Sequence, residues 1–276
     1  MHMEINTQFR ISKDFQLKDE NASLRPLADK PESKTDSKSG DKLSTISFAE
    51  KIANYQEILY AQKKHKLLIV LQGMDTSGKD GTVRGVFGQI NPLGARTVAF
   101  KAPSTVEREH DYLWRIHQEV PVTGEIVIFN RSHYEDVLIT RVHEWITEAE
   151  CKRRFAQIRD FERMLTETGT VMLKFFLHIS KAEQKQRLEE RLADPDKHWK
   201  FDPQDLVERE YWDRYQQAYT DAIKASDADH APWYIIPSNS KTQRNLAIAQ
   251  IVVEKLESMK LAFPPGNPEY SKIKVS

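Results

Sequence analysis

Five short apolar runs, each separated from the next by a stretch with helical periodicity, constrain the fold of this chain most strongly. They are KLLIVLQ (66–72), RTVAF (96–100), GEIVIFN (124–130), VMLKFFLHI (171–179) and PWYIIP (232–237). Continuous apolar runs of this length are typical of strands buried on both faces. Because strands that alternate with helices form parallel sheets through right-handed crossovers, the pattern predicts an α/β protein. We expect a three-layer sandwich with a mostly parallel five-stranded sheet.

The residues before the first run are poorer in apolar side chains. Residues 9–26 hold scattered apolar residues, enough for an extended arm on the main body. Residues 29–43 hold one large apolar residue, Leu43, so they cannot bury enough surface to offset the entropy of ordering. This composition predicts a flexible tether. Ser47 and Glu50 form a capping-box pattern, which predicts a helix over 48–64.

The overall composition excludes a general attraction to nucleic acid or membranes. Lys plus Arg equals Asp plus Glu at 41 each in 276 residues, so any specialisation for anions must be local. No run approaches the ~20 apolar residues of a membrane span, and the first residues lack a signal-peptide core. The single cysteine, Cys151, excludes an intramolecular disulfide and is expected on a helix surface. We expect a soluble, cytoplasmic protein without a nucleic-acid or membrane partner.

The stretch GMDTSGKDGT (73–82) follows the first predicted strand and precedes a predicted helix. This context is the one that a phosphate-binding P-loop requires. Glycines let backbone N–H groups converge on phosphate oxygens, the helix N-terminus adds positive potential, and Lys79 supplies a mobile charge. A plain glycine turn is the alternative. The phosphate-binding candidates are Gly73, Thr76, Ser77, Gly78 and Lys79.

Two carboxylates stand in this loop, and one occupies a place where the motif has Ser or Thr. A carboxylate beside bound phosphate is repulsive unless a divalent cation lies between them, so Asp75 is the candidate Mg²⁺ ligand. Asp80 replaces the usual hydroxyl residue at the first turn of the helix, where a carboxylate favours the macrodipole.

Polar residues also follow the third strand, in VIFNRSHYEDV (127–137). Ligands of parallel sheets lie beyond the carboxyl ends of the strands, so Asn130 and Arg131 are expected in the same crevice as the P-loop. Arg131 can hold two phosphoryl oxygens at once, although a surface ion pair is the alternative. Asn130 takes the usual place of a Walker B aspartate and can orient phosphate or metal-bound water, with Asp75 or Asp136 supplying the charge. His133 is expected to face solvent.

A basic cluster, EQKQRLEERLADPDKHWKF, covers 183–203. Arg187 and Arg191 share a helix face at i,i+4 spacing, and Lys197 and Lys200 follow in a loop. A solvated helix face is the ordinary interpretation of such charges. After the fourth strand of a P-loop fold, however, the position favours a helical lid that closes on phosphates and excludes water.

Five segments together resemble the polyphosphate kinase 2 family over residues 46–262. They are GMDTSGKDGT, FKAPS with EHDYLWRIH, FNRSHYEDVL, DPDKHWKF and APWYIIPSNSK. The resemblance implies a P-loop kinase fold related to thymidylate kinase, and phosphoryl transfer between inorganic polyphosphate and a nucleotide with Mg²⁺, Mn²⁺ being an alternative. Members specific for ADP usually have Asp before the arginine. Asn130, followed by SHYED, instead resembles the subgroup that phosphorylates AMP as well as ADP.

The resemblance also assigns the candidate residues to roles. The catalytic set is Asp75 (also the metal ligand), Lys79, Asn130, Arg131 and the lid residue Arg187. The set for polyphosphate is Gly73, Thr76, Ser77, Gly78, Lys79, Asp80, Arg191, Lys197 and Lys200. The set for the nucleotide is Lys101, Glu107, Asp111, Arg115, Arg131, Ser132, Glu135 and Asp136. Trp114 is left out, because an aromatic at helical spacing is more often part of a core.

The sequence therefore predicts an arm and tether over 1–45, a kinase domain with its lid over 46–264, and a tail over 265–276. The predicted enzyme moves a phosphoryl group reversibly from polyphosphate to AMP, ADP or both, with guanine nucleotides as an alternative, and forms a dimer or a tetramer. Two other functions stay open. One is an ATP-dependent nucleoside monophosphate kinase of the thymidylate kinase type, and the other is a non-catalytic nucleotide- or polyphosphate-binding regulator.

Overall fold

A computed structural model describes residues 5–27 and 34–275 and contains one five-stranded sheet. The strands are β1 (Lys66–Gln72), β2 (Ala95–Ala99), β3 (Ile126–Asn130), β4 (Thr170–His178) and β5 (Trp233–Pro237). Their order is β2-β3-β1-β4-β5, and every neighbouring pair is parallel. All five apolar runs are strands, so the predicted α/β fold is confirmed. Leu71 pairs with Asn130, which places the ends of β1 and β3 side by side.

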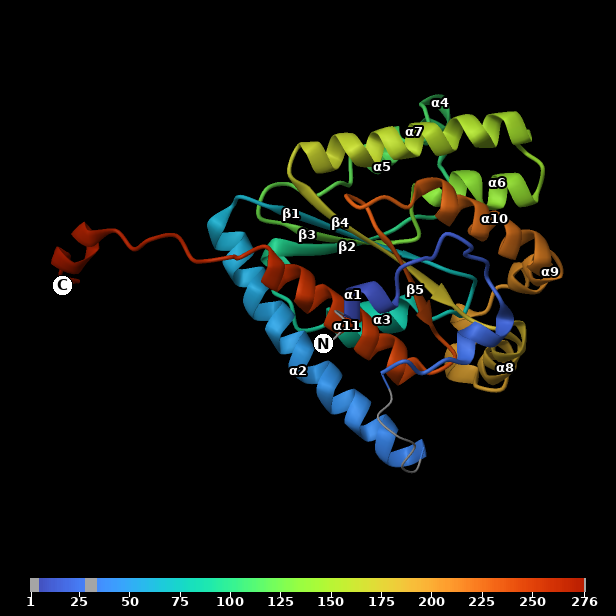
Figure 1. The fold of residues 1–276 in the computed structure, drawn as a ribbon, viewed down its shortest axis with the longest axis horizontal. Helices are drawn as coiled ribbons and strands as arrows, with labels where there is room; N and C mark the ends of the chain where they lie inside the picture. Colours follow the sequence, from blue (N-terminus) through green and yellow to red (C-terminus); the bar gives the residue numbers. More distant parts are fainter. Residues whose placement is uncertain (1–4, 28–33, 276) are drawn as a thin grey trace.

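Helices cover both faces of this sheet (Figure 1). One face carries α7 (Glu148–Glu167) and α10 (Trp212–Ser226), and the other carries α2 (Lys34–Gln62), α3 (Lys79–Val86) and α11 (Lys241–Ser258). Alternate residues of β1 enter opposite cores, with Leu68 and Val70 on the first face and Ile69 on the second. Two-sided burial explains why the strands are continuously apolar.

Shorter elements connect these layers. The remaining α-helices are α1 (Ile5–Gln8), α4 (Thr105–Glu109), α5 (Trp114–His117), α6 (Ile139–Val142), α8 (Lys181–Leu192) and α9 (Gln204–Glu210). The 3₁₀ helices are η1 (Asp19–Ser23), η2 (Pro92–Gly94), η3 (His133–Val137), η4 (Pro195–Lys200) and η5 (Pro268–Lys272). In the described part of the chain, no helix combines the length and the apolarity that crossing a bilayer requires.

Helix α2 begins much earlier than the sequence predicts. It starts at Lys34, and Ser47 and Glu50 lie inside it, so the predicted capping box and the helix start at 48 are wrong. The predicted tether is also wrong for 34–43, whereas 29–33 lie outside the described residues. A polar anchor explains the difference, because the buried Asp41 carboxylate accepts hydrogen bonds from Thr242 (2.7 Å) and Gln243 (2.5 Å) of α11.

The segment before this helix contacts the edge of the sheet. The backbone N–H of Ile235 donates to the carbonyl oxygen of Phe9 at 2.8 Å, and Phe9 is buried. Arg10 pairs with Asp227 at 3.1 Å. At the other end of the chain, the segment that includes η5 runs away from the body (Figure 1).

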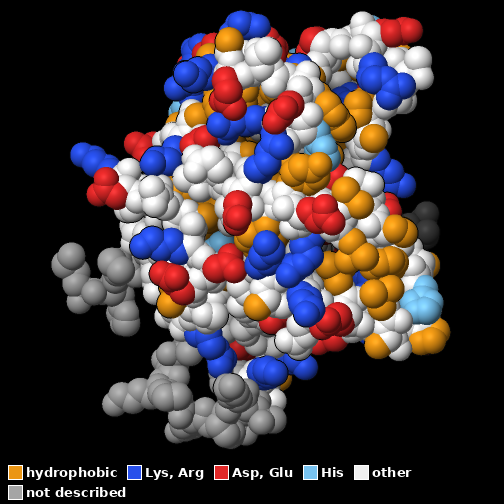
Figure 2. Space-filling view, turned by 90° about the vertical axis from the view of Figure 1, so that its right-hand side faces the viewer, with side chains coloured by type: hydrophobic (Ala, Val, Ile, Leu, Met, Phe, Trp, Pro, Cys, Tyr) orange, Lys and Arg blue, Asp and Glu red, His pale blue; other side chains and the backbone are white. Residues whose placement is uncertain are grey.

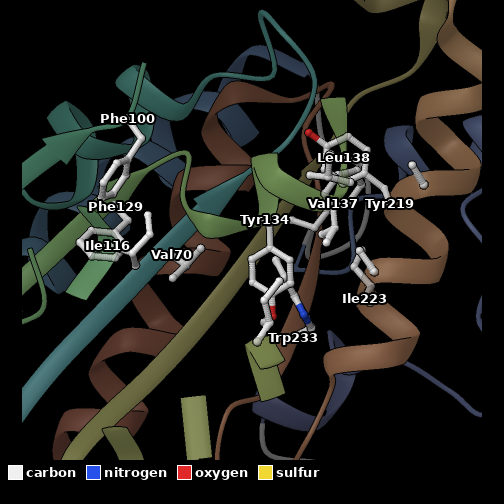
Figure 3. Close-up of a cluster of buried hydrophobic side chains, with 14 of the residues drawn as sticks. Val70, Phe100, Ile116, Phe129, Tyr134, Val137, Leu138, Tyr219, Ile223 and Trp233 are labelled. Atoms are coloured by element: carbon white, nitrogen blue, oxygen red, sulfur yellow. The ribbon is translucent and has the colours of Figure 1, made fainter. Parts of the chain in front are cut away.

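The core beneath the ends of β1 and β3 contains aromatic pairs and a buried polar network. Figure 3 shows Tyr134 beside Trp233, and their ring centroids lie 4.8 Å apart. The Lys174 ammonium donates to Glu162 at 2.5 Å and to the Tyr134 hydroxyl at 3.0 Å. His133 contacts Glu162 at 3.2 Å and is fully buried, so its predicted exposure is wrong. These hydrogen bonds hold His133 and Tyr134, and so they fix the backbone that follows Arg131.

Cys151 is another residue whose predicted position is wrong. It lies in α7, and its side chain is buried in the core instead of lying on the helix surface. The charged residues around it in the sequence concealed the apolar face that α7 packs against the sheet.

Candidate active site

The P-loop joins the end of β1 to α3 with a strongly bent backbone. Gly73 and Gly78 have φ angles of 152° and 104°, and Thr76 has a φ of 65°. A Cβ atom on Gly78 would lie 1.9 Å from Nη1 of Arg244, and one on Gly73 would lie 2.7 Å from the Leu177 oxygen. Gly73 is therefore required by close approach of backbone as well as by its conformation, whereas Gly78 is required chiefly by its conformation.

Two hydroxyls of this loop are buried without a partner. Thr76 Oγ1 and Ser77 Oγ make no hydrogen bond to any other described residue. Buried polar atoms are normally paired, so unpaired ones in a phosphate-binding loop fit a site that a ligand completes.

Lys79 extends over the loop from the first turn of α3. Its ammonium donates to the carbonyl oxygens of Gly73 at 2.6 Å and Met74 at 3.2 Å. Burial, followed by the nearby charge of Arg131, lowers the pKa of Lys79 to about 8. The lysine is thus held where a phosphate oxygen could replace its carbonyl partners.

Arg131 connects the end of β3 with the P-loop. Its Nη2 lies 2.6 Å from Oδ1 of Asp75, and its Nη1 lies 3.5 Å from Oε2 of Glu135. Its φ of 64° is the left-handed conformation that turns the chain away from the strand. The pKa of Arg131 is raised chiefly by Glu135, so the guanidinium is always charged. The structure thus brings together the two residues that the sequence singled out most strongly.

Asn130, Asp80 and Lys200 form a chain of contacts across the same crevice. The Asn130 amide donates to Asp80 Oδ1 at 2.8 Å, and the Lys200 ammonium lies 3.7 Å from Asp80 Oδ2. Asp80 therefore links the strand end to the lid, in addition to its predicted place at the helix N-terminus.

We use the term lid for α8, η4 and α9, which span the segment 183–203 predicted to be a lid, and closure of this segment stays a prediction. Arg191 donates to the Lys200 carbonyl oxygen at 2.8 Å and to Asp205 at 3.3 Å, whereas Lys197 pairs with Asp194 at 2.5 Å. The lid side of the molecule carries basic side chains interspersed with acidic ones (Figure 2). The lid cations are thus held by carboxylates of the chain itself.

Asp205 is a candidate site residue that the sequence did not reveal, and it pairs with Arg191 at 3.3 Å. Burial, followed by the nearby Asp75, raises its pKa to about 6. It lies in the sequence DPQDLVERE, which has the composition of an ordinary exposed helix start. Nothing in its spacing relates it to the P-loop, so only the folded chain identifies it.

Arg187 lies behind the P-loop instead of facing the crevice. Its guanidinium donates to the carbonyl oxygens of Thr76 (2.9 Å) and Ser238 (2.7 Å), and its Nε donates to Glu183 (2.8 Å). These bonds tie the loop to the end of β5. Direct contact of Arg187 with a substrate stays a prediction, and in this conformation it acts on the loop backbone.

A cavity of about 290 Å³ opens beside the end of β2. Lys101, Glu107 and Arg115 line it, as does Trp114. Trp114 is half-buried and stacks on His110, with ring centroids 4.0 Å apart, so its expected place in a core is wrong. The cavity has an aromatic side and charged groups, which suits a nucleotide base and its sugar.

The other residues predicted to bind the nucleotide take different positions. Arg115 lies 3.7 Å from Asp136, whose pKa is raised by burial. Ser132 is buried beside the side-chain amide of Gln72. In the orientation of this amide that satisfies both its oxygen and its nitrogen, the nitrogen donates to Glu135 at 3.0 Å. Asp111 is exposed and caps a turn at Leu113. Ser132 therefore supports Glu135, whereas Asp136 orients Arg115.

The oxygen donors of the crevice fit a magnesium ion. The described residues contain no group of three or more His, Cys, Asp or Glu side chains that could hold a metal ion. Mg²⁺ usually keeps several waters and binds one or two carboxylates together with substrate phosphates, so Asp75 and the unpaired loop hydroxyls are a suitable donor set.

The pKa of Lys79 predicts a pH dependence of phosphate binding. A lysine with a pKa of about 8 is charged below that pH and neutral above it. We expect the dissociation constant of tripolyphosphate, measured by calorimetry without metal, to rise between pH values of about 7 and about 9.5. Lys79→Arg stays charged over this range and is the control that should respond less to pH. Identical profiles for the two proteins would contradict the assignment.

The phosphate-binding loop, the arginine at the strand end and the basic lid define a phosphoryl-transfer enzyme of the P-loop kinase class. The family model described as Polyphosphate kinase 2 (PPK2) matches residues 35–264. This chain belongs to the polyphosphate kinase 2 family.

Individual relatives agree with this assignment. The AMP/ADP-polyphosphate phosphotransferase of Meiothermus ruber is 51% identical over 223 residues, which cover 81% of this chain and 84% of the relative. The ADP-polyphosphate phosphotransferase of Rhodopseudomonas palustris is 40% identical, with 79% and 80% covered. The crystal structure of polyphosphate kinase 2 from Arthrobacter aurescens TC1 matches with a TM-score of 0.91 at 40% identity and covers 96% of this chain and 93% of that chain.

Proposed function

We propose that this enzyme transfers a phosphoryl group reversibly from inorganic polyphosphate to AMP and to ADP. The observation that carries the proposal is the position of Arg131. Its guanidinium lies between Asp75 of the P-loop and Glu135 of the SHYED segment, which the proposal assigns to the donor side and the acceptor side of the crevice. The similarity to a relative named for both AMP and ADP supports the choice of acceptors.

The donor phosphates bind at the P-loop in this proposal. Repeated anions need no base pocket, so backbone N–H groups, Lys79 and the lid cations suffice for recognition. Arg191 and Lys200 exchange their carboxylate partners for phosphate oxygens when the lid closes. Closure excludes water, which would otherwise hydrolyse the donor.

The acceptor nucleotide binds in the cavity beside β2. Trp114 offers a ring for stacking, and Lys101, Glu107 and Arg115 offer polar contacts. The acceptor phosphate then lies against Arg131, which can hold two oxygens at once. Because the transition state of phosphoryl transfer spreads charge over the equatorial oxygens, a fixed guanidinium at this point lowers the barrier.

Mg²⁺, or Mn²⁺ in its place, is the metal in this proposal. Asp75 would hold it, and Asn130 would orient metal-bound water or phosphate. When bound, the metal supplies charge neutralisation between the donor phosphates and the Asp75 carboxylate. A homo-oligomeric state, a cytoplasmic location and the use of guanine nucleotides stay predictions. The cytoplasm is a reducing compartment, and the free thiol of Cys151 is compatible with that location.

The range of acceptors is tested with hexametaphosphate as the donor. The purified protein with Mg²⁺ is given AMP, ADP, GMP and GDP in parallel, and the products are separated by ion-exchange chromatography. We expect ADP and then ATP from AMP, and ATP from ADP. Conversion of ADP with no conversion of AMP would contradict the proposed subgroup.

A further inference from the structure

Arg244 lies behind the P-loop and has no assigned role. It stands in the first turn of α11, and the residue is only 3% exposed. Its Nη1 donates to the Ser77 carbonyl oxygen at 3.2 Å, and its Nη2 donates to Asn245 Oδ1 at 2.9 Å. The same Nη1 lies so close to Gly78 that no side chain larger than hydrogen fits between them. Arg244 therefore contacts the phosphate-binding backbone directly from its rear side.

The charge of Arg244 has no carboxylate partner among the described residues. Its two acceptors, a carbonyl and an amide oxygen, are both neutral. The nearby Arg187 is also buried, and burial together with Arg187 lowers the pKa of Arg244 to about 9. In the described part of the chain, Glu183 is the single carboxylate that forms an ion pair with either of these two guanidinium groups, and its partner is Arg187. Since buried charges are costly unless they are paired, a cation kept at this place implies an anion on the other side of the loop.

The contacts of Arg244 also orient the loop. Both Arg187 and Arg244 donate to the Ser77 carbonyl oxygen. A trans peptide unit carries its carbonyl oxygen and its N–H on opposite sides. An oxygen held from the rear therefore directs the N–H of Gly78 away from the two arginines and into the loop.

We propose that Arg244 is a positioning residue for the phosphoryl donor, and that its buried charge is balanced by the donor phosphates bound on the opposite face of the Ser77–Gly78 peptide. The inference rests on the proposed binding of polyphosphate at the P-loop. It extends that function to a residue outside the crevice, which touches no substrate atom and acts through the backbone and through charge.

The test compares Arg244→Gln and Arg244→Lys at neutral pH. Arg244→Gln removes the charge and is expected to raise both the KM for hexametaphosphate and the dissociation constant of tripolyphosphate about tenfold. The KM for AMP should stay unchanged. Arg244→Lys restores the charge without the planar geometry of the guanidinium group. It should therefore recover a large part of the lost affinity for tripolyphosphate.

Arg96→Gln is the matched control. Arg96 is an arginine of β2 whose charge is balanced by Glu119 and Glu125, so its replacement should leave the affinity for tripolyphosphate unchanged. The ligand-free Arg244→Gln protein should unfold within about 4 °C of the wild type, because losing an unpaired buried charge offsets the lost hydrogen bonds.

Two outcomes would overturn the inference. One is an unchanged dissociation constant of tripolyphosphate in Arg244→Gln, and the other is equal losses in the Gln and Lys variants. Calorimetric binding is independent of turnover, so these outcomes differ from a failure of the proposed function, in which the wild type binds tripolyphosphate but transfers nothing to a nucleotide.

Discussion

Replacement of Arg131 by alanine is expected to lower turnover by on the order of a thousandfold, since losing an arginine that stabilises phosphoryl transfer costs roughly 10³ to 10⁵. The guanidinium lies 2.6 Å from Asp75 and 3.5 Å from Glu135, so it is the cation that both sides of the crevice share. Initial rates of ADP formation from AMP and hexametaphosphate measure the effect. Circular dichroism checks that the fold is retained, which we expect because Arg131 lies outside both cores.

Arg131→Lys separates charge from geometry. A lysine is a point charge and cannot bind two oxygens in the planar arrangement of a guanidinium, so we expect it to recover little of the lost rate. A wild-type rate in either variant would show that Arg131 is only a partner for Asp75 and Glu135.

Asp75→Asn is expected to lose most of the activity and most of its dependence on Mg²⁺. Asp75 lies within the P-loop and carries the negative charge nearest to Arg131, so the amide would remove both the proposed metal ligand and the ion pair. Activity is measured against Mg²⁺ concentration, with hexametaphosphate and AMP held constant.

Asp80→Ser is the matched control, because it restores the residue type usual in P-loops. The Asp80 side chain is 64% exposed, and its contact with Lys200 is long, at 3.7 Å. Exposed ion pairs contribute about 0 to 1 kcal/mol, so this variant should keep much of the activity. An inactive Asp80→Ser together with a wild-type Mg²⁺ titration of Asp75→Asn would reverse the roles of the two acids.

The strands and the P-loop could be predicted because their signals are local. Five apolar runs mark five strands, and the spacing of Gly73, Gly78 and Lys79 identifies the phosphate-binding turn without knowledge of the rest of the chain. Arg131 followed from the rule that the carboxyl ends of neighbouring parallel strands meet at one edge, and Asp75 followed from the rule that a carboxylate beside bound phosphate needs a cation.

The residues that sequence reasoning missed depend on distant partners. Helix α2 extends to Lys34 because Asp41 binds side chains some 200 positions later, a contact that no local pattern indicates. His133 is buried because Glu162 and Lys174 provide a polar network inside the core. Each of these residues is of a polar type that usually lies on the surface, and only its distant partner shows that it is buried.

The direct test of the central claim is the source of the phosphoryl group that reaches AMP. The purified enzyme is incubated with AMP, Mg²⁺ and ³²P-labelled polyphosphate, without ATP, and a parallel reaction receives γ-labelled ATP as the only donor. Lys79→Ala serves as the control for contaminating kinases, because it removes the P-loop cation. The account predicts that label from polyphosphate appears in ADP and ATP with the wild type and not with Lys79→Ala. Labelling of ADP from ATP alone would contradict it and would identify a nucleoside monophosphate kinase, whereas binding of polyphosphate without any transfer would identify a regulator.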